Sequence, residues 1–400
     1  MSMILVVAQR IPYPPNKGEK LRTYHHIKRM VESGYEVEVV SLRHDDSDNE
    51  LASALAKHLN ISVRLFSMQP KLLRYAKALA KFQAMSVAAF ESKQLKDYIL
   101  NKVASSSNID SIYLSASSLA PYILNSQLND NQTLKLNMDF MDVDSDKWNQ
   151  YAQSSAWPMS CIYAREAKKI KLLEQKTLAR FDHVFLIADA EITLFEQSVS
   201  KTKPVHKLGN GLDFDAFPPG KPEDKSNTPV YLFTGVMDYK PNIDAVVWFV
   251  EECWDTIKSK IPNARFVIAG MNPSAQVQAL TRIDGVEVTG FVEDILPYYH
   301  SAWVFVAPFR LARGVQNKVL QASACRIPIV TTPMGAEGIP FATPNSMYFA
   351  ESSAQFADNC IQAVQDQQQA TDKAQQVYEA ITATYSWETQ LTPLMKALSS

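Results

Sequence analysis

Residues 303–331 read WVFVAPFRLARGVQNKVLQASACRIPIVT, and this stretch contains the pattern on which the fold prediction rests. The apolar run Trp303–Ala307 predicts a buried strand, the segment Val315–Cys325 has the composition of a helix, and Ile327–Thr331 predicts the next strand. Gly314 marks the turn from strand to helix. A strand, a helix and a second strand in succession predict parallel strands joined by a helix that covers one face of their sheet.

The same alternation extends along most of the chain. Further strands are predicted at Ile4–Ala8, Val37–Leu42, Ile61–Phe66, Ile109–Leu114, Leu134–Met138, Val184–Ala188, Val230–Thr234, Arg265–Ala269 and Val286–Thr289. Long helices are predicted at Lys20–Ser33 and Asn242–Lys260, and the tail from Ala370 to Ser400 is also predicted to be helical. This α/β pattern predicts two Rossmann-type domains that face each other across a cleft.

The length of 400 residues favours two domains, because a single core rarely grows this large. We expect an N-terminal acceptor-binding domain over 1–205, a C-terminal nucleotide-sugar-binding domain over 206–380, and a final helix, 381–400, that packs back toward the N-terminal domain. The stretch Pro218–Pro229 (PPGKPEDKSNTP) is rich in proline and charge and is typical of an interdomain linker.

Composition excludes several classes of protein. The formal net charge of -2 disfavours nucleic acid as a partner. The four cysteines are scattered and form no zinc-binding pattern, which favours a reduced, cytoplasmic compartment. No apolar stretch approaches the roughly 20 residues of a membrane span, and the N-terminus resembles a strand more than a signal peptide. Any membrane association is therefore expected to be peripheral, on the inner face of the plasma membrane.

Ligands of open parallel sheets bind at the carboxyl ends of the strands, so the loops from strand to helix are the expected sites. The loop after the first strand contains Gly18, directly before a helix, where the backbone can approach a phosphate or a sugar closely. A surface loop stiffened by proline is an equally good interpretation. The loop after Val230–Thr234 contains Gly235 at its turn and Lys240, which can pair with a diphosphate or remain solvated.

The loop within 303–331 carries the strongest prediction of an anion site. Its glycine and the start of the following helix are surrounded by basic and amide side chains, namely Arg310, Arg313, Gly314, Asn317, Lys318 and Gln321. Helix N-termini bind anions through free N–H groups and the positive end of the helix dipole, and arginine adds bidentate contacts. The alternative is an ordinary turn with exposed bases. We expect a diphosphate here, with Gln321 bonded to a ribose hydroxyl.

Three segments of this half, together with the loop NGLD at 210–213, resemble the GT-B glycosyltransferases of family 4. The segments are GVMDYKPNIDAV at 235–246, VTGFVED at 288–294 and GVQNKVLQASA at 314–324. Within that family, the chain is similar to sugar transferases of bacterial exopolysaccharide systems. The resemblance implies two Rossmann-like domains, a nucleotide-diphospho-sugar donor, transfer with retention, and no essential metal or other cofactor. It places Gly18 near the donor, Lys240 and Lys318 near its phosphates, and Gln321 near its ribose.

The sequence departs from the family at two positions where glutamates, eight residues apart, are common. Arg313 and Gln321 occupy them here. A positive charge at Arg313 favours an anionic donor sugar, such as a uronic acid. The expected function is transfer of a sugar, as a hexosyltransferase, from a UDP- or GDP-linked donor to a glycan or lipid-linked acceptor in cell-surface polysaccharide biosynthesis. A nucleotide-sugar epimerase and a non-catalytic homologue that binds nucleotide sugar are the alternatives.

Four aspartates follow the strand predicted at Leu134–Met138, in the stretch MDFMDVDSDKW at 138–148. A calcium loop is excluded, since Lys147 replaces the required glycine and Gln153 the required glutamate. A metal-binding DxD motif and a loop with capping aspartates remain as alternatives. Asp142 is the candidate catalytic carboxylate, beside the acceptor hydroxyl. Trp148 and Trp157 are candidates for stacking on a sugar or for core packing.

The segment 71–82 (KLLRYAKALAKF) predicts a basic amphipathic helix. Lys71, Arg74, Lys77 and Lys81 recur every three or four residues and therefore share one side of the helix. Helices of this kind bind anionic membrane surfaces. We therefore expect 71–82 to contact such a surface, with a solvated surface helix as the alternative.

Overall fold

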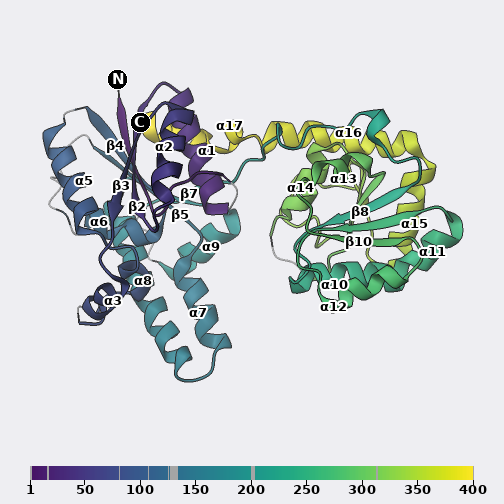
Figure 1. The fold of residues 1–400 in the computed structure, drawn as a ribbon, viewed down its shortest axis with the longest axis horizontal. Helices are drawn as coiled ribbons and strands as arrows, with labels where there is room; N and C mark the ends of the chain where they lie inside the picture. The colour runs from purple at the N-terminus through teal and green to yellow at the C-terminus, as the bar shows by residue number, and fades with distance from the viewer. Residues whose placement is uncertain are drawn as a thin grey trace. The chain divides into compact units, whose positions relative to one another are not determined.

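The structure is a computed structural model that describes residues 2–15, 18–80, 82–106, 108–124, 126, 134–199, 203–311 and 314–399. The chain divides into two compact units. The first comprises Met1–Gly211 with Gln390–Ser400, and the second comprises Leu212–Thr389. Both units consist of a parallel sheet covered by helices (Figure 1).

The first unit contains a seven-stranded sheet in the order β3-β2-β1-β4-β5-β6-β7. Its strands are β1 (Met3–Ala8), β2 (Glu36–Arg43), β3 (Ser62–Ser67), β4 (Ile109–Leu114), β5 (Lys135–Met141), β6 (His183–Leu186) and β7 (His206–Lys207). Every residue of β1 is buried, because this central strand has helices on both faces of the sheet.

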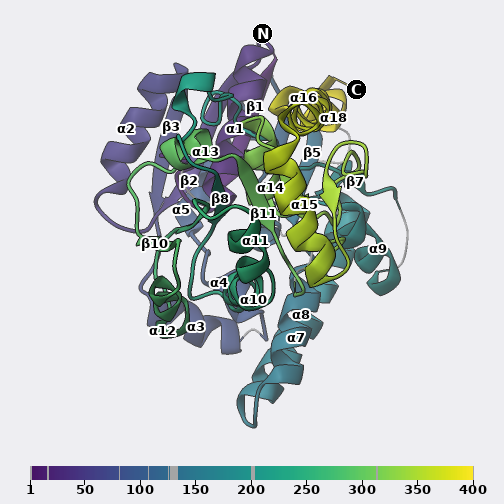
Figure 2. The same cartoon turned by 90° about the vertical axis from the view of Figure 1, so that its right-hand side faces the viewer.

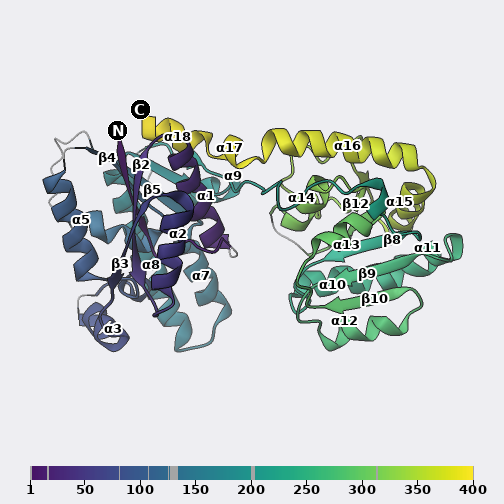
Figure 3. The ribbon, with the colours of Figure 1, turned by 45° about the horizontal axis from the view of Figure 1, so that its top comes forward.

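The helices of the first unit follow the strands in the alternation that the sequence predicts. They are α1 (Gly18–Glu32), α2 (Asp48–Leu59), α3 (Lys71–Ala80), α4 (Met85–Ala88), α5 (Lys93–Ser105), α6 (Pro121–Leu124), α7 (Asp144–Ser154), α8 (Met159–Arg180), α9 (Asp189–Ser198) and α18 (Thr392–Ser399), with a 3-10 turn at Ser117–Leu119. In Figures 1 and 3, α1 and α2 lie on one face of the sheet and α5 lies on the other. The helices α7 and α8 form a long hairpin.

The second unit contains a six-stranded sheet in the order β10-β9-β8-β11-β12-β13. Its strands are β8 (Val230–Thr234), β9 (Arg265–Ala269), β10 (Val286–Gly290), β11 (Val304–Ala307), β12 (Ile329–Thr331) and β13 (Tyr348–Phe349). Its helices are α10 (Lys240–Phe249), α11 (Asp255–Lys260), α12 (Ala275–Ala279), α13 (Leu296–Ser301), α14 (Asn317–Ala324), α15 (Ser353–Gln365), α16 (Gln367–Thr384) and α17 (Trp387–Gln390), with short turns at Pro222–Asp224 and Leu280–Arg282. In Figures 1 and 2, α10 and α12 lie on one side of this sheet and α13 and α14 on the other.

One predicted element differs in detail from the structure. The helix expected over Asn242–Lys260 begins at Lys240 and contains a π-helical turn at Val250–Trp254, between α10 and α11. Trp254 within this turn is fully buried, and its indole Nε1 donates to the Asp284 carbonyl over 2.9 Å. The wider turn therefore accommodates a large buried ring against the sheet.

The stretch Pro218–Pro229 is not the boundary between the units, although its composition predicts a linker. The boundary lies at Gly211 and Leu212, and the proline-rich stretch belongs to the second unit. Side chains of that unit hold it in place. The His300 ring hydrogen-bonds the Pro218 carbonyl over 2.9 Å, and the Trp303 indole donates to the Ser226 carbonyl over 2.9 Å.

Among the described residues, no helix is long and apolar enough to cross a membrane.

Candidate functional site

The second unit contains a cavity of about 680 Å³ at the carboxyl ends of its strands. Its wall comes from the loops after β8, β9 and β10 and from the first turns of α10 and α14, which is where a Rossmann-type sheet binds its ligands. Of the residues predicted to bind a donor, Gly235, Asn317, Lys318 and Gln321 line this cavity. Its volume is in the range of pockets that hold a small molecule or a cofactor.

Two glycines bring the loops after β8 and β9 together. Gly235 has φ +156°, and a Cβ added to it would lie 2.8 Å from Asn242 Nδ2 and 2.9 Å from Lys318 Nζ. Gly270 has φ +148°, and a Cβ added there would lie 1.7 Å from the Gly235 carbonyl oxygen. No side chain fits at Gly270 without displacing this backbone, so the cavity wall requires glycine at that position.

Lys318 lies at the start of α14, with its charge inside the cavity wall. Its Nζ donates to Asn242 Oδ1 over 2.6 Å and lies 4.7 Å and 4.9 Å from the ring centres of Phe233 and Phe309. Burial lowers the pKa of Lys318 to about 7. Among the ion pairs of the described residues, none joins Lys318 to a carboxylate. A partly buried lysine without an acidic partner, at a helix N-terminus, is well suited to bind an anion.

Gln321 lies one turn further along α14, where a chain of hydroxyl groups orients its amide. The Tyr299 hydroxyl donates to Gln321 Oε1 over 3.1 Å, and Thr234 Oγ1 lies 2.8 Å from the same hydroxyl. Tyr299 is fully buried, so this arrangement is fixed by the core. Because the amide oxygen already accepts from Tyr299, Gln321 offers a ligand its N–H groups.

The remaining predicted donor residues lie elsewhere. Arg310 lies outside the cavity lining: its guanidinium pairs with Asp244, with Nη2 and Oδ1 2.6 Å apart, and stacks over the Trp248 ring. Lys240 is the exposed first residue of α10 and is not among the described lining residues. Gly314 adopts φ +68°, and its N–H donates to Glu337 Oε2 over 3.2 Å. Arg313, with the prediction of an anionic sugar, lies outside the described residues.

The first unit contains its own cavity, of about 460 Å³. It lies at the carboxyl ends of β1, β4 and β5 and is lined by Asp142, Gly18, Trp148 and Lys147 among others. Asp142 is exposed and follows Met141, a non-glycine residue with φ +64°. This left-handed backbone is unusual for methionine, and it directs the chain from the end of β5 into the loop that carries Asp142. The cavity combines aromatic and carboxylate groups, which suits a saccharide.

The other three aspartates of the cluster make contacts within the protein. Asp139 is buried and accepts two bonds from Arg22, over 2.7 Å and 2.9 Å, and one from the Tyr113 hydroxyl over 3.0 Å. Asp144 accepts from Ser117 Oγ, and burial raises the pKa of its carboxyl. Asp146 accepts from the Gln150 side chain over 2.5 Å. Among the four, Asp142 therefore remains the carboxylate best placed for a ligand.

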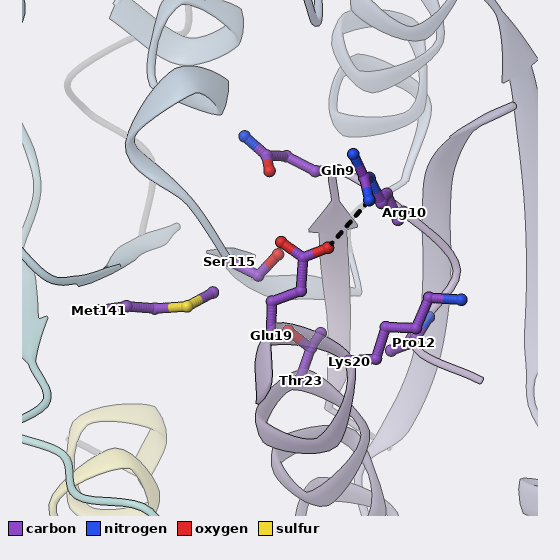
Figure 4. Close-up of a pocket in the computed structure, with 8 residues that line it drawn as sticks. All are labelled: Gln9, Arg10, Pro12, Glu19, Lys20, Thr23, Ser115 and Met141. Atoms are coloured by element: carbon purple, nitrogen blue, oxygen red, sulfur yellow. Dashed lines mark ion pairs between the residues drawn. The ribbon is translucent and has the colours of Figure 1, made fainter. Parts of the chain in front are cut away.

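Gly18 is the first residue of α1, and a Cβ added to it would meet nothing within 4 Å. Beside it, Arg10 and Glu19 form an ion pair with Nη1 and Oε1 3.6 Å apart, in a small pocket of about 10 Å³ (Figure 4). Figure 4 shows Glu19 extending from α1 toward Arg10, with Ser115 and Met141 at the side. A space of this size holds about one water molecule, so the larger cavity is the better candidate for a binding site in this unit.

The segment 71–82 does not present one uniform basic side, because Lys71 is exposed whereas Arg74 is buried. Arg74 is buried and donates to the Ala89 carbonyl, and Lys77 pairs with Glu91 over 3.1 Å. Lys81 lies outside the described residues. Next to Lys71, the exposed side of α3 carries Leu72 and Leu73, which are 86% and 60% exposed. Helical spacing predicts which residues share a side, but α4 and its flanking residues decide which side faces inward.

Tyr299 and Gly270 are among the residues of the second unit's cavity that the sequence analysis did not single out. Tyr299 orients Gln321 from α13, and nothing in the spacing of the sequence connects them. Gly270 directly follows the apolar strand β9, and a glycine at a strand's carboxyl end is a signal that could have identified it.

Comparison with known proteins finds a family model that matches part of the second unit. The family model of the glycosyl transferases group 1 matches residues 228–366, which lie in the second unit. The "Uncharacterized 44.6 kDa protein in cps region" of Klebsiella pneumoniae is 21% identical over 374 residues, which is 90% of each chain.

Solved structures match over the full length. Anabaena Alr3699/HepE in complex with UDP has a TM-score of 0.66 at 14% identity and 100% coverage of both chains. The same protein with UDP-glucose has a TM-score of 0.63 at 15% identity and the same coverage. Sucrose-phosphate synthase from Thermosynechococcus elongatus has a TM-score of 0.63 at 15% identity, over 99% of this chain and 98% of that chain. The predicted GT-B fold is thereby confirmed, and the second unit carries a glycosyl transferases group 1 domain.

Proposed function

We propose that this protein is a retaining glycosyltransferase that uses a nucleotide-diphospho-sugar, UDP- or GDP-linked, as its donor. The observation that carries the proposal is Lys318, a partly buried lysine at the start of α14 in a cavity of about 680 Å³. The group 1 match over 228–366 supports sugar transfer, and the structures of Alr3699/HepE with UDP and UDP-glucose support a uridine nucleotide.

Lys318 and the N-terminus of α14 would bind the diphosphate and stabilise the charge that grows on it as the sugar leaves. Asn242 holds the lysine by its hydrogen bond of 2.6 Å, so the ammonium group is positioned before a ligand arrives. Gln321 would donate its amide N–H to a ribose oxygen. A backbone free of side chains at Gly235 and Gly270 leaves room for the phosphates at the cavity wall.

The acceptor would be a glycan or a lipid-linked saccharide in cell-surface polysaccharide biosynthesis, bound in the cavity of the first unit. Asp142 is our candidate for the carboxylate that assists deprotonation of its hydroxyl. The relative from the cps region of Klebsiella pneumoniae supports this polysaccharide context.

Calorimetry with UDP-, GDP- and dTDP-sugars tests the donor assignment. We expect one nucleotide series to bind, and Lys318→Met to weaken that binding about tenfold or more, since a hydrogen bond to a charged group contributes about 1.5–3 kcal/mol. Lys240→Ala is the matched control, because Lys240 is exposed and outside the cavity lining, and its affinity should stay within about threefold. Failure of every nucleotide to bind, or wild-type affinity in Lys318→Met, would contradict the proposal.

Product analysis separates the alternatives that the sequence leaves open. Conversion of the donor sugar to its epimer without an acceptor would indicate an epimerase, and tight binding without turnover of any sugar would indicate a non-catalytic homologue. For a transferase, Asp142→Asn should lower turnover with unchanged donor affinity. Asp146→Asn is the control, because Asp146 already accepts from Gln150.

A further inference from the structure

The hairpin of α7 and α8 ends in a long stretch without any charged residue. Residues 148–164 read WNQYAQSSAWPMSCIYA and include the bend between the two helices. Figures 1 and 3 show this bend at the far end of the hairpin, away from the sheet. Trp157 in the bend is 80% exposed, and Met159 and Ile162 in the first turn of α8 are 41% and 48% exposed. An exposed bend is usually solvated by charged or small polar groups, so these apolar side chains call for an explanation.

Packing within the hairpin does not explain why an aromatic residue, Trp157, lies at the bend. The two helices are joined by a different aromatic group, in which the ring centres of Trp148, Tyr151 and Tyr163 lie 5.6 Å to 5.9 Å apart. Trp148 also lines the cavity of the first unit, which gives it a second role. Trp157 takes no part in this cluster and contributes its surface to solvent.

The charged surface of α8 beyond this stretch is basic. Lys168, Lys171 and Lys176 are exposed. Both acids of the helix are buried and used within the unit: Glu166 accepts from Ser86 N and Oγ over 2.7 Å and 2.8 Å, and Glu174 accepts from Ser145. An apolar, aromatic tip followed by exposed lysines matches the layers of an anionic bilayer, in which acyl chains lie beneath a plane of phosphates.

A second apolar patch lies on α3 and just after it, where Leu72, Leu73 and Phe82 are 86%, 60% and 72% exposed. This segment is attached to α8, since Arg165 Nη2 donates to the Gln83 carbonyl over 3.0 Å. Figures 1 and 3 both draw α3 toward the same lower end of the first unit as the hairpin bend. The two patches are therefore parts of one end of the unit.

We propose that this end of the first unit is a membrane-docking surface, formed by Trp157, Met159 and Ile162 with Leu72, Leu73 and Phe82, and that it binds an anionic lipid bilayer. This surface would also bring a lipid-linked acceptor close to the cavity of the first unit, an inference that rests on the proposed function. The helix α7 begins at Asp144, which lines the cavity, and its 11 residues span about 16 Å to the bend. A bilayer bound at the bend holds a lipid-linked acceptor about one helix length from Asp142.

The protein carries its own site for a reporter of this contact. Cys161 is exposed beside the bend, whereas Cys253, Cys325 and Cys360 are buried, so a thiol-reactive, polarity-sensitive dye should label Cys161 selectively. We expect its emission to shift to the blue with vesicles of phosphatidylcholine and phosphatidylglycerol, and to change little with phosphatidylcholine alone. The absence of any shift with the anionic vesicles, at low salt, would overturn the proposal.

Flotation of unlabelled variants with the same vesicles assigns the contact to the tip. Trp157→Ser with Ile162→Ser should bind about tenfold more weakly, and Lys168→Glu with Lys171→Glu should lose the preference for anionic lipid. Leu172→Ser is the matched control, because Leu172 lies on the same helix with a similar exposure of 47% and is further from the bend; it should float like wild type. Circular dichroism confirms that each variant is folded.

Two further outcomes would also reject the docking surface. If Leu172→Ser reduces flotation as much as the double tip variant, general apolarity of the helix explains the binding. If sedimentation shows a dimer that the tip variant dissociates, and vesicle binding is unaffected, the surface is a contact between copies of this chain. Both assays are performed without nucleotide, so their outcome does not depend on the donor assignment.

Discussion

Lys318 is held in an environment that opposes its own charge. Burial lowers the pKa of the ammonium group to about 7, so roughly half of the free protein carries a neutral lysine at neutral pH. A diphosphate bound against Nζ favours the charged form and raises this pKa again. Donor binding should therefore be strong below pH 7 and should weaken as the pH rises through 7, by about tenfold between pH 6 and pH 8.

Calorimetry with a nucleotide-diphospho-sugar at pH 6, 7 and 8 measures this dependence. Each phosphate of such a donor has one ester bond and one anhydride bond and no proton that titrates in this range, so the dependence reports on the protein. In buffers of different ionisation enthalpy, binding at pH 7.5 should also show uptake of a proton. Lys318→Arg is the control, because arginine stays charged throughout and its pH profile should be flat. A pH-independent affinity in the wild type would contradict the expectation.

At this scale, residue type and local spacing predicted some partners and missed others. Lys318 and Gly235 come together because both follow strands of one parallel sheet, and the position of a residue after a strand can be read from the sequence. Arg310 follows the same strand as Lys318, but its guanidinium pairs with Asp244 on α10. Which of two nearby bases remains without an acid depends on side-chain packing between helices, and no local pattern encodes it.

At the scale of the elements, hydrogen bonds to the buried side chain of Glu174 join α7 and α8 at the end of the hairpin near the sheet. Glu174 on α8 accepts from Ser145 N over 3.0 Å and from Ser145 Oγ over 2.6 Å, at the first turn of α7. Burial raises the pKa of Glu174 to about 7, from 4.5. A folded pKa above the unfolded value means that ionisation opposes folding. The ionisation of Glu174 therefore costs no stability below pH 4.5. Between pH 4.5 and pH 7 it should lower the free energy of unfolding by about 3 kcal/mol.

The variant Glu174→Gln retains an acceptor for Ser145 and removes the ionisation. We expect its melting temperature, relative to wild type, to rise as the pH increases from 5 to 8. Thermal unfolding followed by circular dichroism at both pH values measures the difference. Asp97→Asn, which changes an acid that is 54% exposed, should show no such trend. A constant difference between Glu174→Gln and wild type at all pH values would count against the shifted pKa.

For the whole molecule, the alternation of strands and helices was sufficient to predict two Rossmann-like units, and the resemblance of three segments to family 4 glycosyltransferases implied the GT-B fold. The expected division at 205/206 lies close to the division at Gly211 and Leu212, whereas the linker predicted from composition, Pro218–Pro229, lies inside the second unit. Hydrogen bonds from His300 and Trp303 attach the proline-rich stretch to the second unit. These side chains are distant in the sequence, so a stretch with the composition of a linker becomes part of a folded unit.

The chain passes between the units twice, and the second passage leads to a prediction. Gln390–Ser400 belongs to the first unit, where Leu391 and Leu394 are fully buried. Burial of a leucine contributes about 2 kcal/mol, so truncation after Thr389 should destabilise the first unit by several kcal/mol. The second unit retains the cavity that contains Lys318, so nucleotide affinity should be unchanged.

Hydrogen–deuterium exchange distinguishes the units in this experiment. In the truncated chain, peptides from β1 and β5 should exchange faster than in wild type, while peptides from β8 and β9 should not change. Truncation after Leu398 is the control, because it leaves both buried leucines in place and should behave as wild type. Faster exchange in β8 with a loss of nucleotide binding would mean that the C-terminal segment supports the second unit instead. Faster exchange in β1 and β5 with unchanged exchange in β8 and β9 would show that Gln390–Ser400, which follows the second unit in sequence, stabilises the first unit.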